Sequence, residues 1–471
     1  MKLRELLHDI VDVNFGIKIK GVTCNPKRVK RGYLFVCVSE RDRIYIDQIL
    51  SCGAKAIIAS DCITNGIIPA RDAGTHIFHP NPQEIYSEIV SRFYQFKQPK
   101  YVAAVTGTNG KTSVVEFCRQ IWQNAGYNAA SIGTLGTYIN NDREDNSDNL
   151  TTPGADDLYA TLCGINVEHL ALEASSHGID QYRIHGLKLA AAAFTNFSQD
   201  HLDYHKDINE YFEAKKKLFY EVLPEGKTAI LNADIDEYCA LLKIAEKRGN
   251  KVITYGKKGS DITLLKQIPA PNGQHLTIKI GDEIYNMFFP VLGQFQAYNL
   301  LCAMGIVTSS GLNYREIRVD KLIFPAGRME KVKPFAFVDY AHTPSALKQA
   351  LLSLKWHFNK KIILVFGCGG NRDRTKRSEM GKIAQMYVDK VIITDDNPRD
   401  EDPAKIRHDI LSDALEIEDR REAIEKGIDI AYNEGMILLV AGKGHERFQI
   451  VSGQTFEFSD VEVIKNHVLT C

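Results

Sequence analysis

A glycine-rich stretch, VTGTNGKTS at residues 105–113, contains the residue types that bind phosphate. It follows the apolar run YVAAVT and precedes an amphipathic segment, so it should join a strand to the first turn of a helix. There the backbone N–H groups of residues 107–110 would cradle phosphates, Lys111 would reach the β- and γ-phosphates, and the Thr112 hydroxyl would reach Mg²⁺. Val105 occupies the first glycine position of the common motif, and an ordinary turn is the alternative.

Three further candidates stand at or after the ends of apolar runs. Glu173 ends LALE, His201 lies in FTNFSQDHLDYH, and Lys215 is the first lysine of YFEAKKKLFY. A carboxylate at a strand end is a hard oxygen ligand for Mg²⁺. Taken alone, Glu173 is most simply a solvated residue, His201 a core or capping residue, and the three lysines a solvated basic face.

An arginine sits among five carboxylates in TDDNPRDED, residues 394–402. This loop, FGCGGNRDRTKR (366–377) and AGKGHERFQ (441–449) each follow an apolar strand. Because ligands of open parallel sheets bind at the carboxyl ends of the strands, we expect the three loops to share one crevice. The acidic residues Asp400, Glu401 and Asp402 are expected to be a solvated helix start.

The elements around these residues indicate an α/β protein of three domains. At 471 residues the chain is too long for one core. Strands alternate with helices, which predicts mainly parallel sheets with helices on both faces. We expect a small α/β domain at 1–98, a central P-loop ATP-binding domain with a parallel sheet at 99–330, and a Rossmann-like domain at 331–471.

The composition is that of a globular protein, with 44% hydrophobic and 25% charged residues. The formal net charge of -1 gives no electrostatic footprint for nucleic acid. The first residues do not resemble a signal peptide, and no apolar run is long enough to span a bilayer. The ten cysteines lack CxxC or zinc spacing, so we expect reduced, buried thiols and a cytoplasmic protein.

The short loop TGTNGKT resembles that of the Mur ligase and folylpolyglutamate synthase superfamily, whose members use ATP to join an amino acid to a carboxylate. The motifs N-x-x-x-D-H-x-D (196–203) and Y-x-x-A-K (211–215) follow in the family's order. The resemblance implies that Glu173 holds one Mg²⁺ with Thr112 and that His201 holds a second. It also implies that CO₂ carbamylates Lys215, which gives the metal site an anion in place of a cation.

Later motifs are similar to the family's nucleotide side. They are GQFQAYN (293–299), PAGRME (325–330) and VDYAHTP (338–344). The resemblance implies that Lys111, His201, Lys215 and Arg328 serve catalysis. The implied ATP residues are Gly107, Thr108, Asn109, Gly110, Lys111, Thr112, Ser113, Asn299 (adenine or ribose), Arg328 (phosphates) and Asp339 (ribose hydroxyls).

The runs LTTPGA (150–155) and SSH (175–177) resemble the UDP-N-acetylmuramoyl-tripeptide synthetase branch of the family. Such a member would hold UDP-N-acetylmuramoyl-L-Ala-D-Glu, a substrate whose carboxylates and pyrophosphate suit an arginine and several hydroxyls. TTP is also typical of a helix start, and both interpretations can hold. The implied substrate residues are Thr151, Thr152, Ser175, Gln181 and Arg183.

The form D-N-P-R is the one this family uses for meso-diaminopimelate. Arg399 would pair bidentately with the distal carboxylate of that amino acid, and Glu446 would take the distal ammonium. Lysine lacks the carboxylate, which would leave Arg399 unmatched. The implied amino-acid site consists of Arg372, Asp396, Asn397, Arg399, Gly442 and Glu446.

The sequence therefore predicts a monomeric ligase that forms an acyl phosphate and then an amide. In the first domain Pro26 and Arg31 replace residues usual for the family, so no uridine contact is predicted there. Two alternatives stay open. One is a sister ligase that adds lysine or acts on folate or another muramoyl peptide, and the other is a P-loop nucleotide switch without ligase activity.

Overall fold

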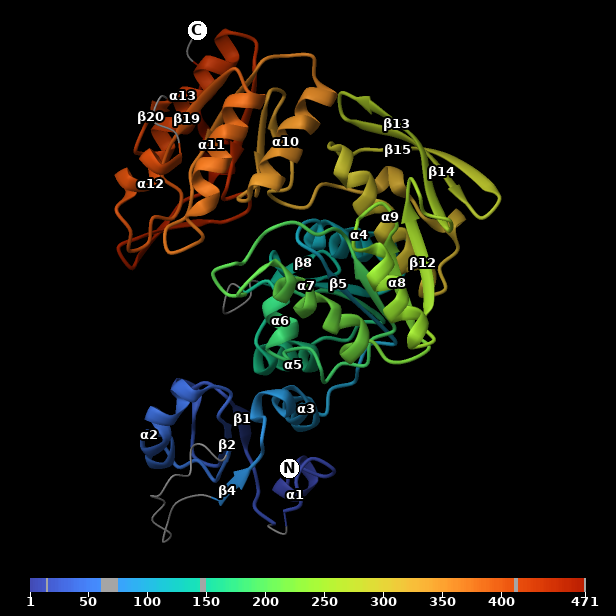
Figure 1. Ribbon diagram of the computed structural model, residues 1–471, viewed down its shortest axis with the longest axis vertical. Coiled ribbons are helices and arrows are strands. Elements are labelled where there is room, and N and C mark those ends of the chain that lie inside the picture. The colour runs from blue at the N-terminus through green and yellow to red at the C-terminus, as the bar shows by residue number, and fades with distance from the viewer. Residues whose placement is uncertain (14–15, 61–74, 145–149, 411–413, 470–471) are drawn as a thin grey trace.

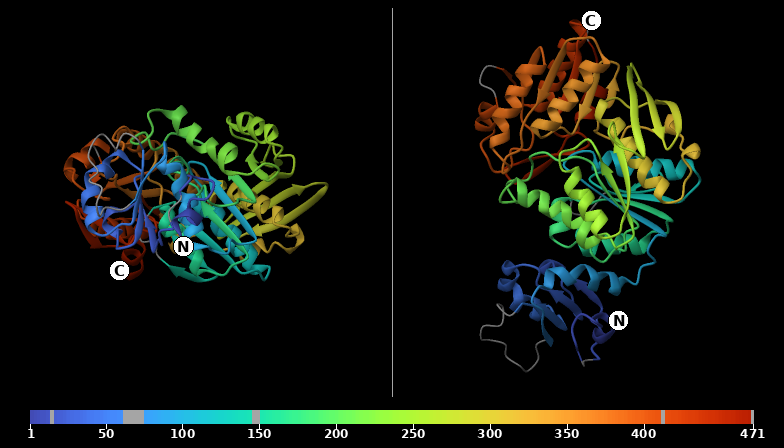
Figure 2. Two further views of the ribbon diagram at one scale, coloured as in Figure 1. Left: turned by 90° about the horizontal axis from the view of Figure 1, so that it is seen from below. Right: turned by 45° about the vertical axis from the view of Figure 1, so that its right-hand side comes forward.

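The computed structural model describes residues 1–13, 16–60, 75–144, 150–410 and 414–469. The chain forms three units in sequence order along the longest axis of the molecule, coloured blue, then cyan to yellow, then orange to red (Figure 1). Each unit is built on its own β-sheet. The right-hand view of Figure 2 shows the N-terminal unit below the central one and the C-terminal unit above it.

The N-terminal unit is a four-stranded parallel sheet in the order β1-β2-β3-β4. Its strands are short, and the residues of β1 and β3 are all buried. The elements are α1 (Leu3–Leu6), β1 (Gly21–Thr23), the 3₁₀ helix η1 (Pro26–Arg28), β2 (Tyr33–Val36), η2 (Glu40–Tyr45), α2 (Ile46–Ser51), β3 (Ala56–Ala59), β4 (Thr75–Phe78) and α3 (Pro82–Tyr94).

Helix α3 fastens this unit to the central one. Ser87 shares a hydrogen bond of 3.0 Å with the Tyr159 hydroxyl and donates to the carbonyl of Arg183 at 3.1 Å. Across the same junction, Nη1 of Arg28 pairs with Oδ1 of Asp157 at 2.7 Å. The junction therefore fixes the backbone of Arg183, which is one of the predicted substrate residues.

The central unit is an eleven-stranded sheet in the order β15-β14-β13-β12-β11-β10-β5-β9-β6-β7-β8, parallel in the middle and antiparallel at both edges. The strands are β5 (Tyr101–Thr106), β6 (Ala129–Gly133), β7 (Gly136–Ile139), β8 (Asp142–Glu144), β9 (His169–Glu173), β10 (Ala191–Phe194), β11 (Thr228–Asn232), β12 (Lys251–Gly256), β13 (Ile262–Ala270), β14 (Gly273–Ile280) and β15 (Glu283–Phe289). The helices are α4 (Lys111–Asn124), α5 (Ala155–Gly164), α6 (Ser176–Asp180), α7 (Ile208–Lys217), the π-helix η4 (Leu218–Val222), α8 (Tyr238–Lys247), α9 (Gln294–Ser309), η5 (Tyr314–Glu316) and η6 (Val319–Lys321).

The middle of this sheet is covered on both faces. Strands β5, β9 and β10 are buried along their whole length, as continuous apolar runs in parallel sheets are. Along β5, Ala103 and Val105 belong to the core with α4 and α9, whereas Val102 and Ala104 belong to the opposite core with α5. This packing sets the N-terminus of α4 at the carboxyl end of β5.

The C-terminal unit is a six-stranded sheet in the order β16-β17-β21-β18-β19-β20, parallel except for β16 at its edge. A separate hairpin, β22–β23, follows it. The elements are β16 (Glu330–Lys333), β17 (Ala336–Asp339), α10 (Pro344–His357), β18 (Ile362–Phe366), α11 (Thr375–Tyr387), β19 (Lys390–Ile393), α12 (Pro403–Ile410), β20 (Leu415–Glu416), α13 (Arg420–Asn433), β21 (Ile437–Ala441), β22 (Phe448–Val451), β23 (Gln454–Glu457) and α14 (Asp460–Asn466).

The predicted α/β class with mainly parallel sheets is confirmed. The sequence analysis missed the antiparallel ribbon β13–β15, although its signals were present. The runs at 262–289 alternate apolar and polar residues, and an Asn-Gly pair at 272–273 marks a hairpin turn. Strand–helix alternation predicts only parallel strands, and these three strands follow one another without a helix between them.

The described cysteines are free thiols, but Cys52, Cys163 and Cys239 are exposed, so the prediction of buried thiols is wrong for these three. Cys52 lies after α2, Cys163 lies within α5 and Cys239 lies within α8. Each occupies a solvent-exposed position on its element. Within the described residues, no helix has the length and apolarity needed to cross a membrane.

A buried ion pair should hold the C-terminal unit together. Arg420 and Asp460 are fully buried and are joined by two contacts of 2.8 Å, and Arg420 also donates to the carbonyl of Ala441 at 3.1 Å. Arg420→Met leaves a buried carboxylate unpaired and is expected to cost about 3–5 kcal/mol of unfolding free energy. Urea unfolding followed by hydrogen exchange of α13 and β21 measures this cost.

The control for that experiment is Arg318→Met. Arg318 pairs with Asp320 at 2.9 Å, but both side chains are about half exposed. An exposed pair is worth at most about 1 kcal/mol. Equal unfolding free energies for the two variants would contradict the assigned role of Arg420.

Candidate active site

The glycine-rich loop joins β5 to α4, as predicted. Gly107 and Gly110 have φ values of +139° and +89°, where residues with side chains are strained. A Cβ at Gly110 would also lie 2.3 Å from Oδ1 of Asn299. The Thr108 N–H donates to the carbonyl of Asn196 at 2.8 Å, which ties the loop to the end of β10. The loop backbone is thus held at a helix N-terminus, where an anion is favoured.

Two cations face this loop from different segments. Nζ of Lys111 donates to the carbonyls of Gly107 and Thr108, both at 2.9 Å. Arg328 reaches in from the segment before the C-terminal sheet, and its Nη2 donates to Oγ1 of Thr112 at 3.0 Å. Burial lowers the pKa of Lys111. Both groups lie where a polyphosphate chain would need neutralisation.

A cavity of about 500 Å³ lies in front of the loop and is lined by both the central and the C-terminal units. Its volume suits a ligand of nucleotide size. The rings of Phe295, Tyr298 and Tyr340 add aromatic surface to its wall. Gly107 lies behind the wall, where its carbonyl accepts from two lysines. The predicted ATP residues that line the cavity are Thr108, Asn109, Gly110, Lys111, Thr112, Ser113, Asn299, Arg328 and Asp339.

Glu173 presents a buried carboxylate to the same cavity. Its Oε1 accepts from the Thr134 backbone N–H at 2.7 Å, and its Oε2 accepts from the Thr134 hydroxyl at 3.2 Å. A Cβ at Gly133 would lie 2.1 Å from Oε1, so a glycine there leaves room for the carboxylate. Burial raises the pKa of Glu173, while Lys111 and the Thr112 hydroxyl oppose the shift. Thr112 and Glu173 therefore offer hard oxygen donors beside the phosphate loop.

His201 also lines the cavity, in a left-handed backbone conformation with φ +55°. Its Nε2 lies 3.5 Å from Oδ2 of Asp200. Burial lowers the pKa of His201 to about 3 against the opposing effect of Asp200, so the ring is neutral near pH 7 and able to donate a lone pair. Across the described ranges, no cluster of three or more His, Cys, Asp or Glu side chains is arranged to hold a metal.

Lys215 lies just behind the phosphate loop, on α7. The residue is 1% exposed, and its Nζ donates to the carbonyl of Gly107 at 2.9 Å and lies 4.4 Å from the centroid of the Tyr211 ring. Burial, reinforced by Lys111, lowers the pKa of Lys215 well below its usual value. Burial therefore favours the neutral amine of Lys215 over the ammonium. The last lysine of the triplet, Lys217, pairs with Asp180 at 2.8 Å.

The predicted substrate residues gather around the carboxyl end of β9. The Thr152 hydroxyl donates to the carbonyl of Glu173 at 2.8 Å and lies 2.9 Å from the Ser175 hydroxyl, which caps α6. Arg183 donates to the carbonyl of Thr152 at 2.5 Å and to Oε1 of Gln181 at 2.6 Å. A further residue, Thr151, lies 3.2 Å from the Thr134 hydroxyl. The group thus adjoins the Glu173 carboxylate.

The three predicted loops of the C-terminal unit do meet. The Gly370 N–H donates to the carbonyl of Asn397 at 2.9 Å, and Nη1 of Arg399 donates to the carbonyl of Gly370 at 2.8 Å. Nδ2 of Asn397 donates to Oε2 of Glu446 at 3.0 Å. A Cβ at Gly442 would lie 2.6 Å from Oδ2 of Asp396, which brings these two positions into the same group.

The backbone and the side chain of Arg399 are both anchored within the C-terminal unit. Its backbone has φ +53° and is bridged to the following hairpin, because its N–H donates to Ile450 at 3.0 Å and its carbonyl accepts from Ser452 at 2.7 Å. Among the described residues, no carboxylate forms an ion pair with its guanidinium. Burial, reinforced by Arg372, lowers the pKa of Arg399. Arg372 itself is half exposed, with its Nη1 3.9 Å from Oδ2 of Asp203 in the central unit.

The expectation of a solvated acidic flank is wrong for Glu401. Its side chain is only 13% exposed and pairs with Arg374 and with Arg377, each at 3.0 Å. Arg377 is almost fully buried and needs this carboxylate as a partner. Asp402 does begin a helix, since its Oδ1 accepts from the Ala404 N–H at 3.0 Å.

Two residues of the site were missed by the sequence analysis. Thr134 fixes the Glu173 carboxylate, and Lys443 is fully buried between Asn397 and Glu446. The local signal for Lys443 was its position between two glycines directly after a buried strand. Thr134 carried no such signal.

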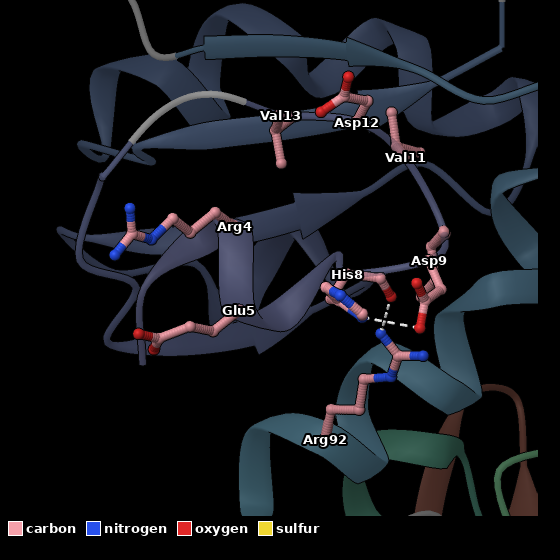
Figure 3. A pocket seen from close by; sticks show the side chains of 9 residues that line it. Arg4, Glu5, His8, Asp9, Val11, Asp12, Val13 and Arg92 are labelled. Atoms are coloured by element: carbon pink, nitrogen blue, oxygen red, sulfur yellow. Dashed lines mark hydrogen bonds and ion pairs between the residues drawn. The ribbon is translucent and has the colours of Figure 1, made fainter.

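A second hollow lies on the N-terminal unit, between the segment after α1 and the end of α3 (Figure 3). Its wall combines the aliphatic side chains of Ile10, Val11 and Val13 with charged side chains, and Arg92 donates to the carbonyl of His8. His8 and Asp9, which pair at 2.7 Å, are largely exposed. It contains none of the predicted site residues.

Comparison with known families agrees with this geometry. The chain matches the Mur ligase middle domain over residues 105–307 and the Mur ligase, glutamate ligase domain over residues 327–444. These spans contain the phosphate loop, Lys215, Arg328, the first two loops of the C-terminal unit and the start of the third, up to residue 444. The N-terminal unit lies outside both spans.

Two relatives are similar over nearly the whole chain. Both are named UDP-N-acetylmuramoyl-L-alanyl-D-glutamate–2,6-diaminopimelate ligase. The one from Anaplasma marginale (strain St. Maries) is 46% identical over 94% of this chain and 95% of its own length. The one from Caulobacter vibrioides (strain ATCC 19089 / CIP 103742 / CB 15) is 42% identical over 94% of both chains.

Two solved ligase structures have folds similar to that of this chain. A structure of a UDP-N-acetylmuramoyl-L-alanyl-D-glutamate–2,6-diaminopimelate ligase aligns with a TM-score of 0.71 at 30% identity, covering 99% of this chain and 98% of its own. The MurF ligase from Thermotoga maritima, solved in complex with ADP, aligns with a TM-score of 0.62 at 19% identity over 91% of this chain and 95% of its own. The second likeness shows the fold alone.

The carboxylate of Asp339 should make nucleotide binding depend on pH. It accepts from the N–H groups of Met329 at 2.7 Å and Ala341 at 2.9 Å, and burial raises its pKa to about 6. As the pH falls through that value, the group gains a proton and loses acceptor capacity for ribose hydroxyls. We expect the Kd for ADP, measured by calorimetry between about pH 5 and about pH 7.5, to rise toward low pH.

Titration of the nucleotide itself contributes to the same curve, so Asp339→Asn is measured in parallel. The variant should bind ADP more weakly at neutral pH and lose the part of the pH dependence that belongs to the carboxyl group. An identical pH dependence in both proteins would contradict the assignment.

Proposed function

The chain belongs to the Mur ligase family, and we propose on that basis that it joins meso-2,6-diaminopimelate to UDP-N-acetylmuramoyl-L-alanyl-D-glutamate with ATP. The observation that carries the proposal is the similarity, along nearly the whole chain, to ligases named for this reaction. The reaction belongs to peptidoglycan precursor synthesis. We place it in the cytoplasm and propose a monomer.

The nucleotide part of the proposal rests on the cavity. ATP would lie with its phosphates at the N-terminus of α4 and its ribose near Asp339. Lys111 at the start of α4 and Arg328 from the segment before the C-terminal sheet both lie at the phosphate loop, so they would neutralise charge that moves between phosphates. The energy for amide formation comes from this nucleotide.

The oxygen donors beside the loop fit Mg²⁺. Thr112 and Glu173 would hold one ion and His201 with carbamylated Lys215 a second, with phosphate oxygens completing each shell. The fit rests on the space that Gly133 leaves for the Glu173 carboxylate. When bound, the ions neutralise phosphate charge and polarise the transferred group.

The reaction would proceed in two displacements. A carboxylate oxygen of the D-glutamyl side chain attacks the γ-phosphorus, the bond to the β-phosphate oxygen breaks, and an acyl phosphate and ADP form. The α-amine at the L centre of diaminopimelate then attacks the acyl carbon, phosphate leaves, and the amine loses a proton. Thr151, Thr152, Ser175, Gln181 and Arg183 would hold the first substrate with its carboxylate near Glu173. Catalysis is then mainly positioning and charge neutralisation.

The amino-acid site should select diaminopimelate through Arg399. The distal end of this amino acid has both a carboxylate and an ammonium, which match Arg399 and Glu446. Arg372, Asp396, Asn397 and Gly442 would complete the site. Both the cavity and the contact between Arg372 and Asp203 span the two units, so closure of the C-terminal unit would deliver the amine to the acyl phosphate.

A sister ligase that adds lysine is the second candidate, and the arginine in the DNPR loop disfavours it because lysine would leave that cation unmatched. A nucleotide switch without ligase activity is disfavoured by the substrate residues grouped around Glu173. A switch would hydrolyse ATP without a carboxylate substrate, whereas a ligase would not.

The proposal is tested by incubating the protein with ATP, Mg²⁺ and UDP-N-acetylmuramoyl-L-Ala-D-Glu. Parallel reactions contain meso-diaminopimelate, L-lysine or no amino acid, and ADP and tripeptide are followed by mass spectrometry. We expect tripeptide with diaminopimelate only. Comparable product with lysine would keep the ligase but overturn the selectivity, and no product with either would overturn the function.

The role of Arg399 is tested in the same assay. Arg399→Met removes the partner of the distal carboxylate, so kcat/KM for diaminopimelate is expected to fall by about 10³-fold. Arg374→Met, which removes an exposed cation of the same unit, serves as the matched control. Equal losses in the two variants would contradict a specific contact.

Carbamylation of Lys215 is a separate prediction. The buried amine has a pKa well below its usual value, and only an unprotonated amine adds CO₂. Protein equilibrated with ¹³C-bicarbonate is expected to give a carbamate carbon signal that Lys215→Gln abolishes and Lys216→Gln preserves. The Lys215→Gln variant should lose about 10- to 100-fold in kcat. An active wild-type protein without the signal would disprove the modification.

A further inference from the structure

Lys443 is a buried cation at the centre of the amino-acid loops. It follows β21 directly in the sequence AGKGHE, and its side chain has no solvent exposure. Its Nζ donates to Oδ1 of Asn397 at 3.0 Å and to Oε2 of Glu446 at 3.2 Å. The mechanism above gives this lysine no role, although burying an ammonium is costly unless its partners are well placed.

The three side chains form a closed hydrogen-bonded triangle. Nδ2 of Asn397 donates to the same Oε2 of Glu446 at 3.0 Å, and Oδ1 of Asn397 accepts a second bond from the Ile450 N–H at 3.0 Å. These contacts fix which way the Asn397 amide faces. They also occupy Oε2 of Glu446 with two donors, while none of the described residues donates to Oε1.

We propose that Lys443 is a positioning residue that orients Glu446 and Asn397 to receive diaminopimelate, an inference that rests on the proposed function. Lys443 holds Oε2 of Glu446 on the protein side and leaves Oε1 facing the amino-acid position. The free oxygen then accepts from the distal ammonium while Arg399 takes the carboxylate beside it. Lys443 itself touches no substrate and acts through the other two side chains.

The charges around Glu446 make this arrangement sensitive to pH. Burial raises the pKa of Glu446, Asp396 raises it further, and Lys443 and the Asn397 amide lower it. Arg399 and the buried Arg420 also face it as cations, and the Tyr340 hydroxyl is neutral. Only the ionised carboxylate accepts from an ammonium. Loss of Lys443 therefore moves protonation of Glu446 to higher pH.

Lys443→Met tests the proposal in full-length protein. We expect the KM for meso-diaminopimelate to rise about 10- to 100-fold, with little change in kcat or in the KM for ATP and for the UDP-linked substrate. The acidic limb of the pH profile of kcat/KM for diaminopimelate should shift to higher pH. A merely structural lysine would change all three KM values together and leave the limb in place.

Lys465→Met is the matched control. Lys465 also pairs with a glutamate three residues away, at 3.6 Å from Glu462, but both side chains are more than half exposed. It should leave every kinetic constant unchanged. If Lys443→Met behaves like this control, the proposal is overturned.

A double-mutant cycle with Glu446→Gln isolates the interaction. If Lys443 acts through Glu446, then Lys443→Met should have little further effect on the KM once Glu446 is already changed. Additive losses would overturn the proposal. The double variant leaves no unpaired buried charge at this pair, so it keeps the cycle informative where the single variant folds poorly, and Lys443→Gln serves as the second single variant.

The wild-type protein separates this inference from the proposed function. Tripeptide formation with meso-diaminopimelate by the wild type upholds the function whatever the variants do. Absence of tripeptide in the wild type overturns the function, and the inference falls with it.

Discussion

Charge buried at the junction of two units governs the structure of this site. Lys111, Glu173 and Arg328 line one cavity, where an isolated ion is costly, and the Lys215 amine lies just behind it. Each group has a hydrogen-bond partner within the protein. The two lysines donate to loop carbonyls, Thr134 donates to the carboxylate, and the arginine donates to the Thr112 hydroxyl. These hydrogen bonds hold the four side chains in place within the protein itself.

The same constraint explains the arrangement of the sheets. Parallel strands place their carboxyl ends at one edge, and the central and C-terminal sheets both direct such an edge toward the cavity. Gly327 lets the chain pass between the units closely, since a Cβ there would lie 2.2 Å from the backbone nitrogen of His445. The segment carrying Arg328 is thus packed against the loop carrying Glu446, and nucleotide and amino-acid positions share one wall.

The sequence was sufficient where local pattern and chemistry coincide. The phosphate loop, the strand ends carrying Glu173 and the meeting of the C-terminal loops followed from strand–turn–helix order. Roles for His201 and Lys215 came only from family resemblance, because a lone histidine or a lysine triplet has no distinctive local pattern. Glu401 was misjudged and Thr134 was missed because their partners lie 24 and 39 residues away in the chain, so burial and pairing emerge only after folding.

The left-handed backbone of Arg399 also bears on how such a site can evolve. At φ +53°, glycine, asparagine and aspartate are accommodated cheaply, whereas β-branched residues are strongly disfavoured. The bonds to Ile450 and Ser452 hold this conformation in place, so the hairpin would have to change with it. A new amino-acid specificity is therefore reached more easily by changing loop length or by substituting neighbouring residues than by exchanging Arg399 for a branched side chain. The backbone conformation at Arg399, as well as its side chain, therefore limits which residues can replace it.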